Sequence, residues 1–364
     1  METILVGMSG GVDSTVTALL LKEQGYNVIG STMAIWGTKG ENGPATQQNQ
    51  KKSCYGTNEK EDINNVRKLC ASLDIPFYEI NCVSQYKKEV LDNFRNEYLS
   101  GRTPNPCVRC NCRIKFGAYP QIAREQGINF DKFATGHYAR IERDVDGDYV
   151  LKRGVAINKD QSYFLYRLTS EQLSKIMLPL GSYTKDEIRA RAKSYGLAVA
   201  DKPDSQDFYS GNYNDLLGIP EKKGNIVNSD GKILGEHNGI WNYTIGQRKG
   251  LCIAAPHPLY VLELRADTNE VVVGYVDETF KQTLFANDLC WIKGRDYVEQ
   301  IIKSKQIFAK TRSTQQPIEV NAEFCNGDLK VVFNDMQKSI TLGQSVVLYD
   351  NDTVLGGGII QSVE

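Results

Sequence analysis

Two short stretches of this sequence combine residue types that could do chemistry. Residues 6–14 read Val-Gly-Met-Ser-Gly-Gly-Val-Asp-Ser, with two adjacent glycines among hydroxyl side chains and the carboxylate of Asp13. Glycines let a backbone approach a ligand closely, and backbone N–H groups at a helix N-terminus favour an anion. The second stretch carries Cys107, Cys110 and Cys112, three thiols within six residues. The first stretch predicts phosphate binding, and the second predicts thiol or metal chemistry.

The elements around residues 6–14 are those that a phosphate loop needs. The apolar run 4–6 predicts a strand, and the run 16–21 predicts a helix that ends at Gly25. The pattern is not that of a Walker loop, because no Gly-Lys-Ser/Thr follows at the required spacing. It resembles the pyrophosphate loop of ATP pyrophosphatases. That resemblance implies cleavage of ATP, with Mg²⁺, to AMP and pyrophosphate while a substrate is adenylated.

Composition limits the classes of protein to consider. A chain of 364 residues, with 41% hydrophobic and 24% charged residues, indicates two or three ordinary globular domains. We expect a cytoplasmic protein without a membrane segment, because no apolar run approaches ~18 residues and no secretion signal is evident. Nine cysteines in that compartment indicate thiols, metal ligands or catalytic groups. A net charge of −1 argues against indiscriminate nucleic-acid binding, but a local basic face remains compatible with it.

Alternating strand and helix patterns predict an α/β fold with a parallel sheet covered on both faces. Further strands are predicted at 27–36, 75–80 and 133–135, and further helices at 59–73, 86–99 and 114–126. The polar segment 38–52 is predicted to be a mobile surface loop. Ligands of such sheets bind at the carboxyl ends of the strands, where residues 6–14 and Gly136-His137 both fall.

The second half of the chain has different sequence patterns from the first half. A hairpin is predicted around residues 144–147, and Thr184 with Glu187 forms a capping box that begins a helix ending at Gly196. We predict three domains: a catalytic domain (1–210), a small connecting domain (211–280) and a C-terminal β-barrel (281–364).

The cysteine segment 101–112 contains Pro104 and Pro106, which predict a rigid loop and exclude a helix. Arg109 and Arg113 are expected to favour thiolate forms of the cysteines. Three thiolates could act in catalysis, hold zinc with a fourth ligand, or hold a 4Fe–4S cluster with one open iron. The cysteines outside this segment that we expect to be inert are Cys70, Cys82, Cys252, Cys290 and Cys325.

Six ordered motifs carry a resemblance that covers essentially the whole chain. They begin with Gly-Met-Ser-Gly-Gly-Val-Asp-Ser and Gly-Arg-Thr-Pro-Asn-Pro-x-x-x-Cys-Asn. Thr-Gly-His-Tyr, Lys-Asp-Gln-Ser-Tyr-Phe-Leu, Thr-Ile-Gly-Gln-Arg-Lys-Gly-Leu and the C-terminal Leu-Gly-Gln-Ser follow in order. Together they resemble the bacterial tRNA-specific 2-thiouridylases.

The resemblance implies a two-step reaction. ATP adenylates O2 of the wobble uridine in tRNA, and a cysteine persulfide then delivers sulfur to C2. By position, Cys110 corresponds to the nucleophile, and Asp13 is counted with the catalytic residues. The positions that correspond to the ATP site are Val6, Gly7, Met8, Ser9, Gly10, Gly11, Val12, Asp13, Ser14, Met33 and Gly136.

The resemblance also implies two partners, tRNA and a sulfur donor, either a persulfide-donating carrier or a cysteine desulfurase. The target base would be extruded from its stack to reach the ATP site. Asn105, Pro106 and Cys107 correspond to the segment that touches this base. Other positions that correspond to tRNA contacts are His137, Lys159, Asp160, Gln161, Arg312, Ser313 and Gln344.

One position departs from the family pattern. Residues 202–209 read Lys-Pro-Asp-Ser-Gln-Asp-Phe-Tyr, and Tyr209 stands where the family's second catalytic cysteine is expected. A phenol cannot carry or reduce a persulfide. Our hypothesis is that the cysteine segment supplies both functions. Cys110 would relay sulfur with Cys107 or Cys112, or the three would ligate a 4Fe–4S cluster.

Two rival functions follow from the same residues. The pyrophosphate loop also suits a small-molecule adenylating ligase, although the cysteine segment and the β-barrel argue against it. Tyr209 suits a catalytically silent tRNA-binding paralogue. Formation of 2-thiouridine separates the silent paralogue from the enzyme, and tRNA-dependent ATP–pyrophosphate exchange separates the ligase.

Overall fold

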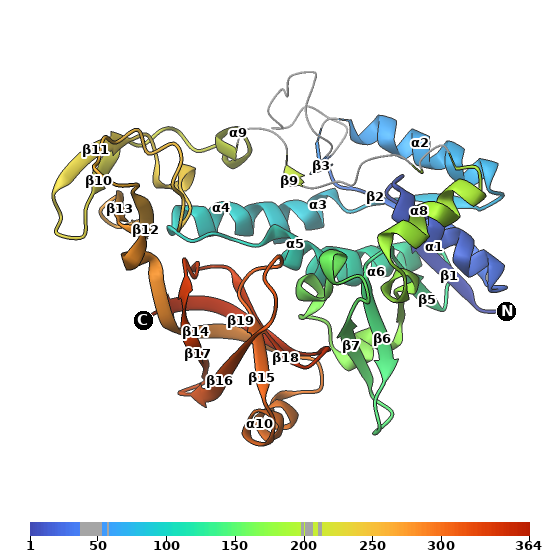
Figure 1. Ribbon diagram of the computed structural model, residues 1–364. Coiled ribbons are helices and arrows are strands. Elements are labelled where there is room, and N and C mark those ends of the chain that lie inside the picture. The colour runs from blue at the N-terminus through green and yellow to red at the C-terminus, as the bar shows by residue number, and fades with distance from the viewer. Residues whose placement is uncertain (37–52, 57, 198–199, 201–206, 210–212) are drawn as a thin grey trace. The chain divides into compact units, whose positions relative to one another are not determined.

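The protein is described by a computed structural model that covers residues 1–36, 53–56, 58–197, 200, 207–209 and 213–364 (Figure 1). The predicted surface loop 38–52 lies outside these residues. The chain divides into two compact units. Unit 1 comprises Met1–Val90, Cys107–Gly211 and Asp352–Val354, and unit 2 comprises Leu91–Pro106, Asn212–Asn351 and Leu355–Glu364.

A five-stranded parallel sheet lies at the centre of unit 1, with strand order β4-β2-β1-β5-β8. Its strands are β1 (Thr3–Gly7), β2 (Asn27–Ala34), β4 (Phe77–Asn81), β5 (Lys132–Ala134) and β8 (Ile176–Met177). The predicted α/β fold is confirmed. The two-residue β8 is too short to leave a periodic pattern, so the sequence did not indicate it. The chain leaves β1 toward β2 on one side and later adds β5 on the other, which places a topological switch point between β1 and β5.

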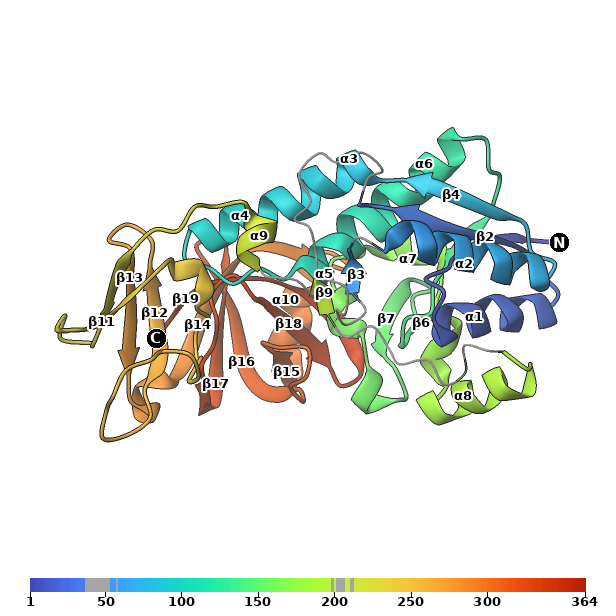
Figure 2. The same ribbon diagram turned by 90° about the horizontal axis from the view of Figure 1, so that it is seen from above.

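Helices cover both faces of this sheet (Figure 2). On one face, α1 (Val12–Glu23) and α2 (Glu59–Ser72) pack Leu21, Val66 and Cys70 against Ile4 and Val6 of β1. On the other face lies α6 (Tyr119–Glu125), whose Tyr119 hydroxyl donates a 2.8 Å hydrogen bond to Ser31 Oγ of β2. Burial on both faces explains why these strands are uniformly apolar.

Further elements complete unit 1. The predicted hairpin consists of β6 (Ala139–Arg143) and β7 (Tyr149–Arg153), which pair across a turn with Gly147 at φ +86°. The predicted capping box begins α8 (Lys185–Ser194), which packs against the outer side of α1. A separate two-stranded sheet joins β3 (Ser53–Tyr55) to β9 (Asp207–Tyr209). Short helices are α7 (Ser170–Ser174), η3 (Ile157–Lys159), η4 (Ser162–Leu165) and η5 (Pro179–Ser182).

The prediction of a rigid loop without helix at 101–112 is wrong from Pro106 onward. Helix α5 (Pro106–Arg109) begins at Pro106 and runs into the π-helical segment η2 (Cys110–Ala118). A proline is tolerated at the first helical position because that N–H needs no partner within the helix. The predicted helix 86–99 is observed as α3 (Val83–Tyr86), the π-helical η1 (Lys87–Leu91) and α4 (Asp92–Leu99).

Unit 2 contains a small sheet and a closed barrel. The small sheet has strand order β11-β10-β13-β12, from β10 (Gly224–Val227), β11 (Ile233–His237), β12 (Tyr260–Arg265) and β13 (Glu270–Gly274). The predicted barrel is confirmed: six strands close through pairing of the first with the last. They are β14 (Phe280–Trp291), β15 (Ile307–Lys310), β16 (Ile318–Cys325), β17 (Asp328–Lys338), β18 (Ser345–Asp350) and β19 (Thr353–Val363).

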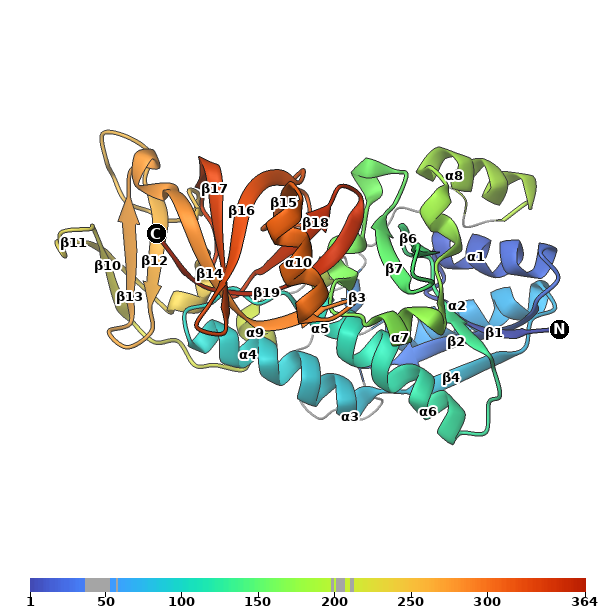
Figure 3. The ribbon, with the colours of Figure 1, turned by 90° about the horizontal axis from the view of Figure 1, so that it is seen from below.

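Apolar side chains fill the barrel, which is therefore a packed core without a channel. Helix α10 (Arg295–Ser304) lies against the barrel (Figure 3). Its buried Val298 belongs to this core. The remaining helical turns of unit 2 are α9 (Tyr213–Leu217), η6 (Ile240–Asn242) and η7 (Val276–Thr279).

Candidate functional site

The glycine loop between β1 and α1 has the geometry of an anion site. Gly10 adopts φ +70°, and Gly11 precedes α1 without a side-chain cap. The amides of the first helical turn are therefore not satisfied by a capping side chain and can meet an anion. The loop is held from within, because the backbone N–H of Ser9 donates to Ser14 Oγ at 3.1 Å and Thr15 Oγ1 donates to the carbonyl of Gly11 at 2.8 Å.

The end of β5 approaches this loop closely at Gly136. A Cβ atom there would lie 2.9 Å from the carbonyl carbon of Asp13 and 3.0 Å from the backbone nitrogen of Ser14. Position 136 therefore requires glycine for steric reasons. Met33 lies partly buried on β2, next to Thr32, whose Oγ1 donates to the carbonyl of Met8 at 2.7 Å. The structure thus brings together the three segments to which the sequence assigned nucleotide binding.

Two residues beside Asp13 were not predicted as site residues. Lys185 Nζ lies 2.8 Å from each carboxylate oxygen of Asp13, and the Tyr138 hydroxyl donates to Oδ1 at 2.8 Å. Lys185 is 9% exposed, so the ammonium is shielded from water and its attraction to Asp13 is stronger than at a surface. No spacing in the sequence relates Lys185 to Asp13, because they lie 172 positions apart. Only the packing of α8 on α1 indicates the pair.

The predicted tRNA-contacting residues of unit 1 differ in exposure. His137 is buried, and its Nδ1 shares a 2.7 Å hydrogen bond with Thr135 Oγ1. Burial and the nearby Lys115 hold the pKa of His137 well below its usual value, so its ring is neutral at pH 7. Asp160 is also buried and accepts hydrogen bonds from the backbone of Gly154 and Ser162, both at 3.1 Å.

The two residues that flank Asp160 differ from it in exposure. Gln161 accepts a 2.9 Å bond from the backbone N–H of Tyr138. Lys159 is exposed. Of the residues predicted to contact tRNA in unit 1, Lys159 therefore presents a cation at the surface, whereas His137 and Asp160 support the local fold.

Cys110 does not have the thiolate character that the neighbouring arginines predicted. Arg109 donates to both the carbonyl and the carboxylate of Glu89, at 3.0 Å each, and Arg113 lies 3.9 Å from the same carboxylate. The positive charges of Arg109 and Arg113 are therefore paired with the carboxylate of Glu89. Burial raises the pKa of Cys110 to about 11, and Lys115 only partly opposes this. Cys110 is a protonated thiol at pH 7, which corrects the prediction.

Metal binding by this segment finds no support in the geometry. Within the described parts of the chain, no three or more His, Cys, Asp or Glu side chains are grouped so that they could hold a metal ion. Cys107 is exposed, whereas Cys112 is partly buried with its Sγ 3.9 Å from the carbonyl of Arg167. The predicted ligand set Cys107, Cys110 and Cys112 is therefore not arranged around a common point.

In unit 2, the structure joins two residues that the sequence assigned to tRNA contact. Gln344 Nε2 donates to the carbonyls of Thr103 and Pro104, both at 3.0 Å, and its Oε1 accepts from Asn105 Nδ2 at 3.4 Å. Gln344 thus fixes the extended segment that leads into Pro106. Arg312 donates to the carbonyl of Ser339 at 2.7 Å, and the adjacent Ser313 is partly exposed.

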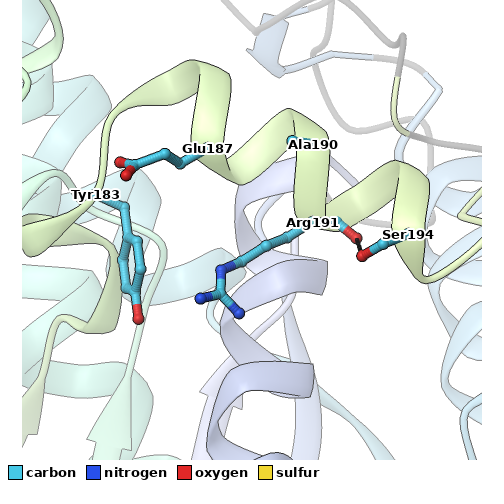
Figure 4. Close-up of a pocket in the computed structure, with 5 residues that line it drawn as sticks. All are labelled: Tyr183, Glu187, Ala190, Arg191 and Ser194. Carbon is cyan, nitrogen blue, oxygen red and sulfur yellow. Dashed lines mark hydrogen bonds between the residues drawn. The ribbon is translucent and has the colours of Figure 1, made fainter.

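A pocket of about 400 Å³ lies along α8 (Figure 4). Its lining residues are Tyr183, Glu187, Ala190, Arg191 and Ser194. The Arg191 guanidinium lies 5.1 Å from the centre of the Tyr183 ring. None of these residues belongs to the predicted sites.

A glycine loop at the switch point of a parallel sheet, between a strand and an uncapped helix, defines a PP-loop protein of the HUP type. The family model described as tRNA methyl transferase HUP domain matches residues 2–209. Those described as tRNA methyl transferase PRC-barrel domain and aminomethyltransferase beta-barrel domain match residues 217–275 and 281–360.

The chain is similar in sequence to other proteins over its whole length. It is 47% identical to the tRNA-specific 2-thiouridylase MnmA of Endomicrobium trichonymphae, over 99% of this chain and 100% of that protein. It is 44% identical to the MnmA of Clostridium botulinum (strain Eklund 17B / Type B), over 100% and 98%. The chain belongs to the tRNA-specific 2-thiouridylase family. Among solved structures, a 4-thiouridine synthetase–RNA complex with bound ATP aligns with 56% of this chain and 44% of that chain, at a TM-score of 0.35 and 18% identity.

Proposed function

We propose that this chain is a tRNA-uridine 2-sulfurtransferase that adenylates O2 of the wobble uridine with ATP and then transfers sulfur to C2. The observation that carries the proposal is the family match over the full chain, with the glycine loop intact and Cys110 at the nucleophile position. Adenylation makes the uridine oxygen part of AMP, which is a good leaving group, and sulfur can then replace it.

The nucleotide would lie with its phosphates on the loop of residues 7–14. There the first amides of α1 and the Ser9 and Ser14 hydroxyls can donate to phosphate oxygens, while the charge of Lys185 lies nearby. Mg²⁺ usually binds through one or two carboxylates together with substrate phosphates, and Asp13 fits that role. Gly136 keeps the end of β5 against the loop.

Sulfur transfer would begin at Cys110. Because its thiol is protonated at pH 7, Cys110 needs to lose a proton before it can accept sulfur. Lys115, which lowers the pKa of Cys110, is the nearby cation that favours this step. A persulfide-donating carrier or a cysteine desulfurase would supply the outer sulfur atom.

We also propose how the chain divides this work. Residues 1–210 would carry both chemical steps, while 211–280 and the barrel 281–364 would contact tRNA, with Asn105, Arg312 and Gln344 among the contacts. The place of action would be the cytoplasm. Among the described residues, no helix has the length and apolar character needed to cross a bilayer.

Nucleoside mass spectrometry tests the proposal. A strain that lacks its own 2-thiouridylase would be complemented with this chain, and digested tRNA would be analysed for 2-thiouridine. The expected result is restoration of 2-thiouridine by the natural sequence and its loss with Cys110→Ser. Absence of the modified nucleoside, with tRNA still bound by the purified chain, would favour the second candidate: a silent tRNA-binding paralogue, which the replacement at Tyr209 motivates.

A further inference from the structure

Tyr138 is the residue at which three of the six sequence motifs meet. It ends the motif Thr-Gly-His-Tyr and is 3% exposed. Its hydroxyl donates to Oδ1 of Asp13, in the glycine loop, at 2.8 Å. Its backbone is bonded to Gln161, which belongs to the motif Lys-Asp-Gln-Ser-Tyr-Phe-Leu. Tyr138 therefore joins the predicted nucleotide site to a segment that was predicted to contact tRNA.

The loop 154–161 meets the main chain of Tyr138 at both of its ends. At the second end, the backbone N–H of Gln161 donates to the carbonyl of Tyr138, and the N–H of Tyr138 donates to Gln161 Oε1, both at 2.9 Å. At the first end, a Cβ atom on Gly154 would lie 2.8 Å from the carbonyl oxygen of Tyr138. A displacement of either end of the loop must therefore move Tyr138 or break these contacts.

The loop 154–161 is also tied from within by the buried Asp160. Oδ1 of Asp160 accepts from the backbone N–H groups of Gly154 and Ser162, both at 3.1 Å. Oδ2 accepts from Ser162 Oγ at 3.0 Å. These bonds connect the start of the loop to its end, so a contact made in the middle of the loop affects both ends together.

The middle of this loop is the part that an external ligand can reach. Val155 and Ile157 are 48% and 55% exposed, and Lys159 is exposed as well. An exposed ammonium suits RNA phosphate, and phosphate contacts supply much of the affinity of RNA-binding proteins. A tRNA bound by Lys159 would therefore contact the loop whose ends meet Tyr138.

The ring of Tyr138 is confined on the side of the nucleotide loop. It belongs to a buried cluster with Val12 and Val16 of α1 and Ile188 of α8. Asp13, which accepts from the Tyr138 hydroxyl, lies in the first turn of the same α1. Because the ring is packed between two helices, its hydroxyl stays on Asp13 unless the backbone of Tyr138 moves.

We propose that Tyr138 is a positioning residue that couples the loop 154–161 to the glycine loop, so that ATP and tRNA bind cooperatively. This inference rests on the proposed function. Contact of tRNA with the loop holds Gln161 on Tyr138, and Tyr138 then holds Asp13 in the orientation that the nucleotide needs. ATP strengthens tRNA binding by the same factor, because coupling between two sites is reciprocal. ATP is thereby bound most tightly beside the tRNA that it adenylates.

A role of Tyr138 in packing alone leads to a different result. Loosened packing would weaken the binding of each ligand independently. The ratio of the Kd for ATP without tRNA to the Kd with tRNA would then stay the same. Loss of the coupling lowers this ratio toward one, so the ratio is the quantity to measure.

The test uses the full-length protein, α,β-methylene ATP and an unmodified tRNA whose wobble base is uridine. Equilibrium dialysis would give the Kd of the nucleotide without tRNA and with saturating tRNA. For the natural sequence we expect tRNA to lower this Kd about 10-fold, and for Tyr138→Phe less than about 2-fold. A ratio of one in the natural sequence, or the natural ratio in Tyr138→Phe, would overturn the proposal.

Tyr149→Phe is the matched control for Tyr138→Phe. It also removes one tyrosine hydroxyl, which accepts an exposed 2.9 Å hydrogen bond from Arg143 and lies in the β6–β7 hairpin. We expect the natural ratio in this variant. A ratio that fell equally in Tyr149→Phe and Tyr138→Phe would mean that the effect is not specific to Tyr138, and would overturn the proposal.

A double-mutant cycle tests the connection through Gln161. Gln161→Met keeps the size of the side chain but removes the acceptor for the N–H of Tyr138. We expect this variant to lower the ratio, and we expect Tyr138→Phe/Gln161→Met to lower it no further than Tyr138→Phe alone. Additive losses in the logarithm of the ratio would show that the two residues act independently, which contradicts the proposal.

The two levels of inference fail separately. If the natural sequence forms 2-thiouridine but the ratio is unaffected by Tyr138→Phe, the proposed function stands and only the coupling is wrong. If no 2-thiouridine is formed while the ratio behaves as expected, the coupling stands and the proposed function is wrong. Circular dichroism of each variant would show that it is folded.

Discussion

The glycine loop and the cysteine segment are both predicted sites of unit 1, but their structures support them to different degrees. The loop is assembled from backbone: Gly10 at φ +70°, the start of α1 and the close approach of Gly136. The cysteine segment depends on side chains whose neighbours come from elsewhere in the sequence, such as Glu89. A site built from backbone is recognisable from a local motif, whereas a site built from distant side chains requires the fold.

Removal of the nucleophile should separate the two regions most sharply. In Cys110→Ser we expect thiolation of tRNA to fall by at least about 1000-fold, because a hydroxyl cannot carry a persulfide. ATP binding should be unchanged, since Cys110 does not contribute to the glycine loop. Nucleoside mass spectrometry and equilibrium dialysis with ATP would measure the two effects. Equal loss of both would mean that the regions are not independent.

The protonation of Cys110 gives the next largest effect. Its pKa is about 11 in the folded protein against 9.0 for an unperturbed thiol, so the thiolate fraction at pH 8 is about 100-fold smaller. Iodoacetamide should therefore alkylate Cys110 about 100-fold more slowly in the native chain than in the urea-unfolded chain. The native rate should rise with pH until the pH passes about 11.

The raised pKa of Cys110 also determines how the stability of the protein depends on pH. The pKa is raised on folding, so the contribution of Cys110 to stability is fully present below pH 9 and is lost as the pH rises through about 11. Fast alkylation of Cys110 in the native chain at pH 7 would contradict this description. It would support the thiolate that was predicted from the neighbouring arginines.

The backbone region can be tested at Gly136. Gly136→Ala would place a Cβ 2.9 Å from the carbonyl carbon of Asp13 and displace the loop or β5. We expect the KM for ATP to rise by roughly 10- to 100-fold in ATP–pyrophosphate exchange, because small displacements of a binding loop are costly. Gly235→Ala is the control, since its Cβ would meet nothing closer than 3.5 Å. An unaltered KM in Gly136→Ala would mean that the loop does not hold the nucleotide.

The sequence predicted features that depend on a local pattern better than features that depend on distant residues. The parallel strands, the capping box at Thr184 and the barrel were predicted correctly, since each depends on a local pattern. The helix that begins at Pro106 was missed because a proline at the first helical position looks, in sequence, like a helix breaker.

Lys185 was missed for a different reason. It lies far from Asp13 in sequence and belongs to no motif, so only the packing of α8 on α1 reveals it. The charge state of Cys110 was wrong for a related reason. Arg109 and Arg113 are its neighbours along the chain, but in space they face Glu89.

The smallest expected effect concerns unit 2. Gln344→Ala removes the donor to the carbonyls of Thr103 and Pro104, and we expect a loss of about 1–2 kcal/mol in the free energy of unfolding. Urea denaturation would measure it. Gln121→Ala, which removes a solvent-exposed pair on α6, should change stability by less than about 0.5 kcal/mol. If Gln344→Ala were as mild as that control, Gln344 would not fix the segment before Pro106.

The pairing of Asp13 with Lys185 has a consequence for nucleotide affinity. The loop keeps a cation beside it before any ligand arrives, and the carboxylate is already held on both oxygens. Much of the entropy needed to order the loop is therefore lost when the chain folds, and less remains to be lost when a nucleotide binds. This preorganisation extends to α8, a helix outside every recognised motif. Substitutions that loosen the contact of α8 with α1 should therefore weaken nucleotide binding from a distance, even though they alter no residue of the loop.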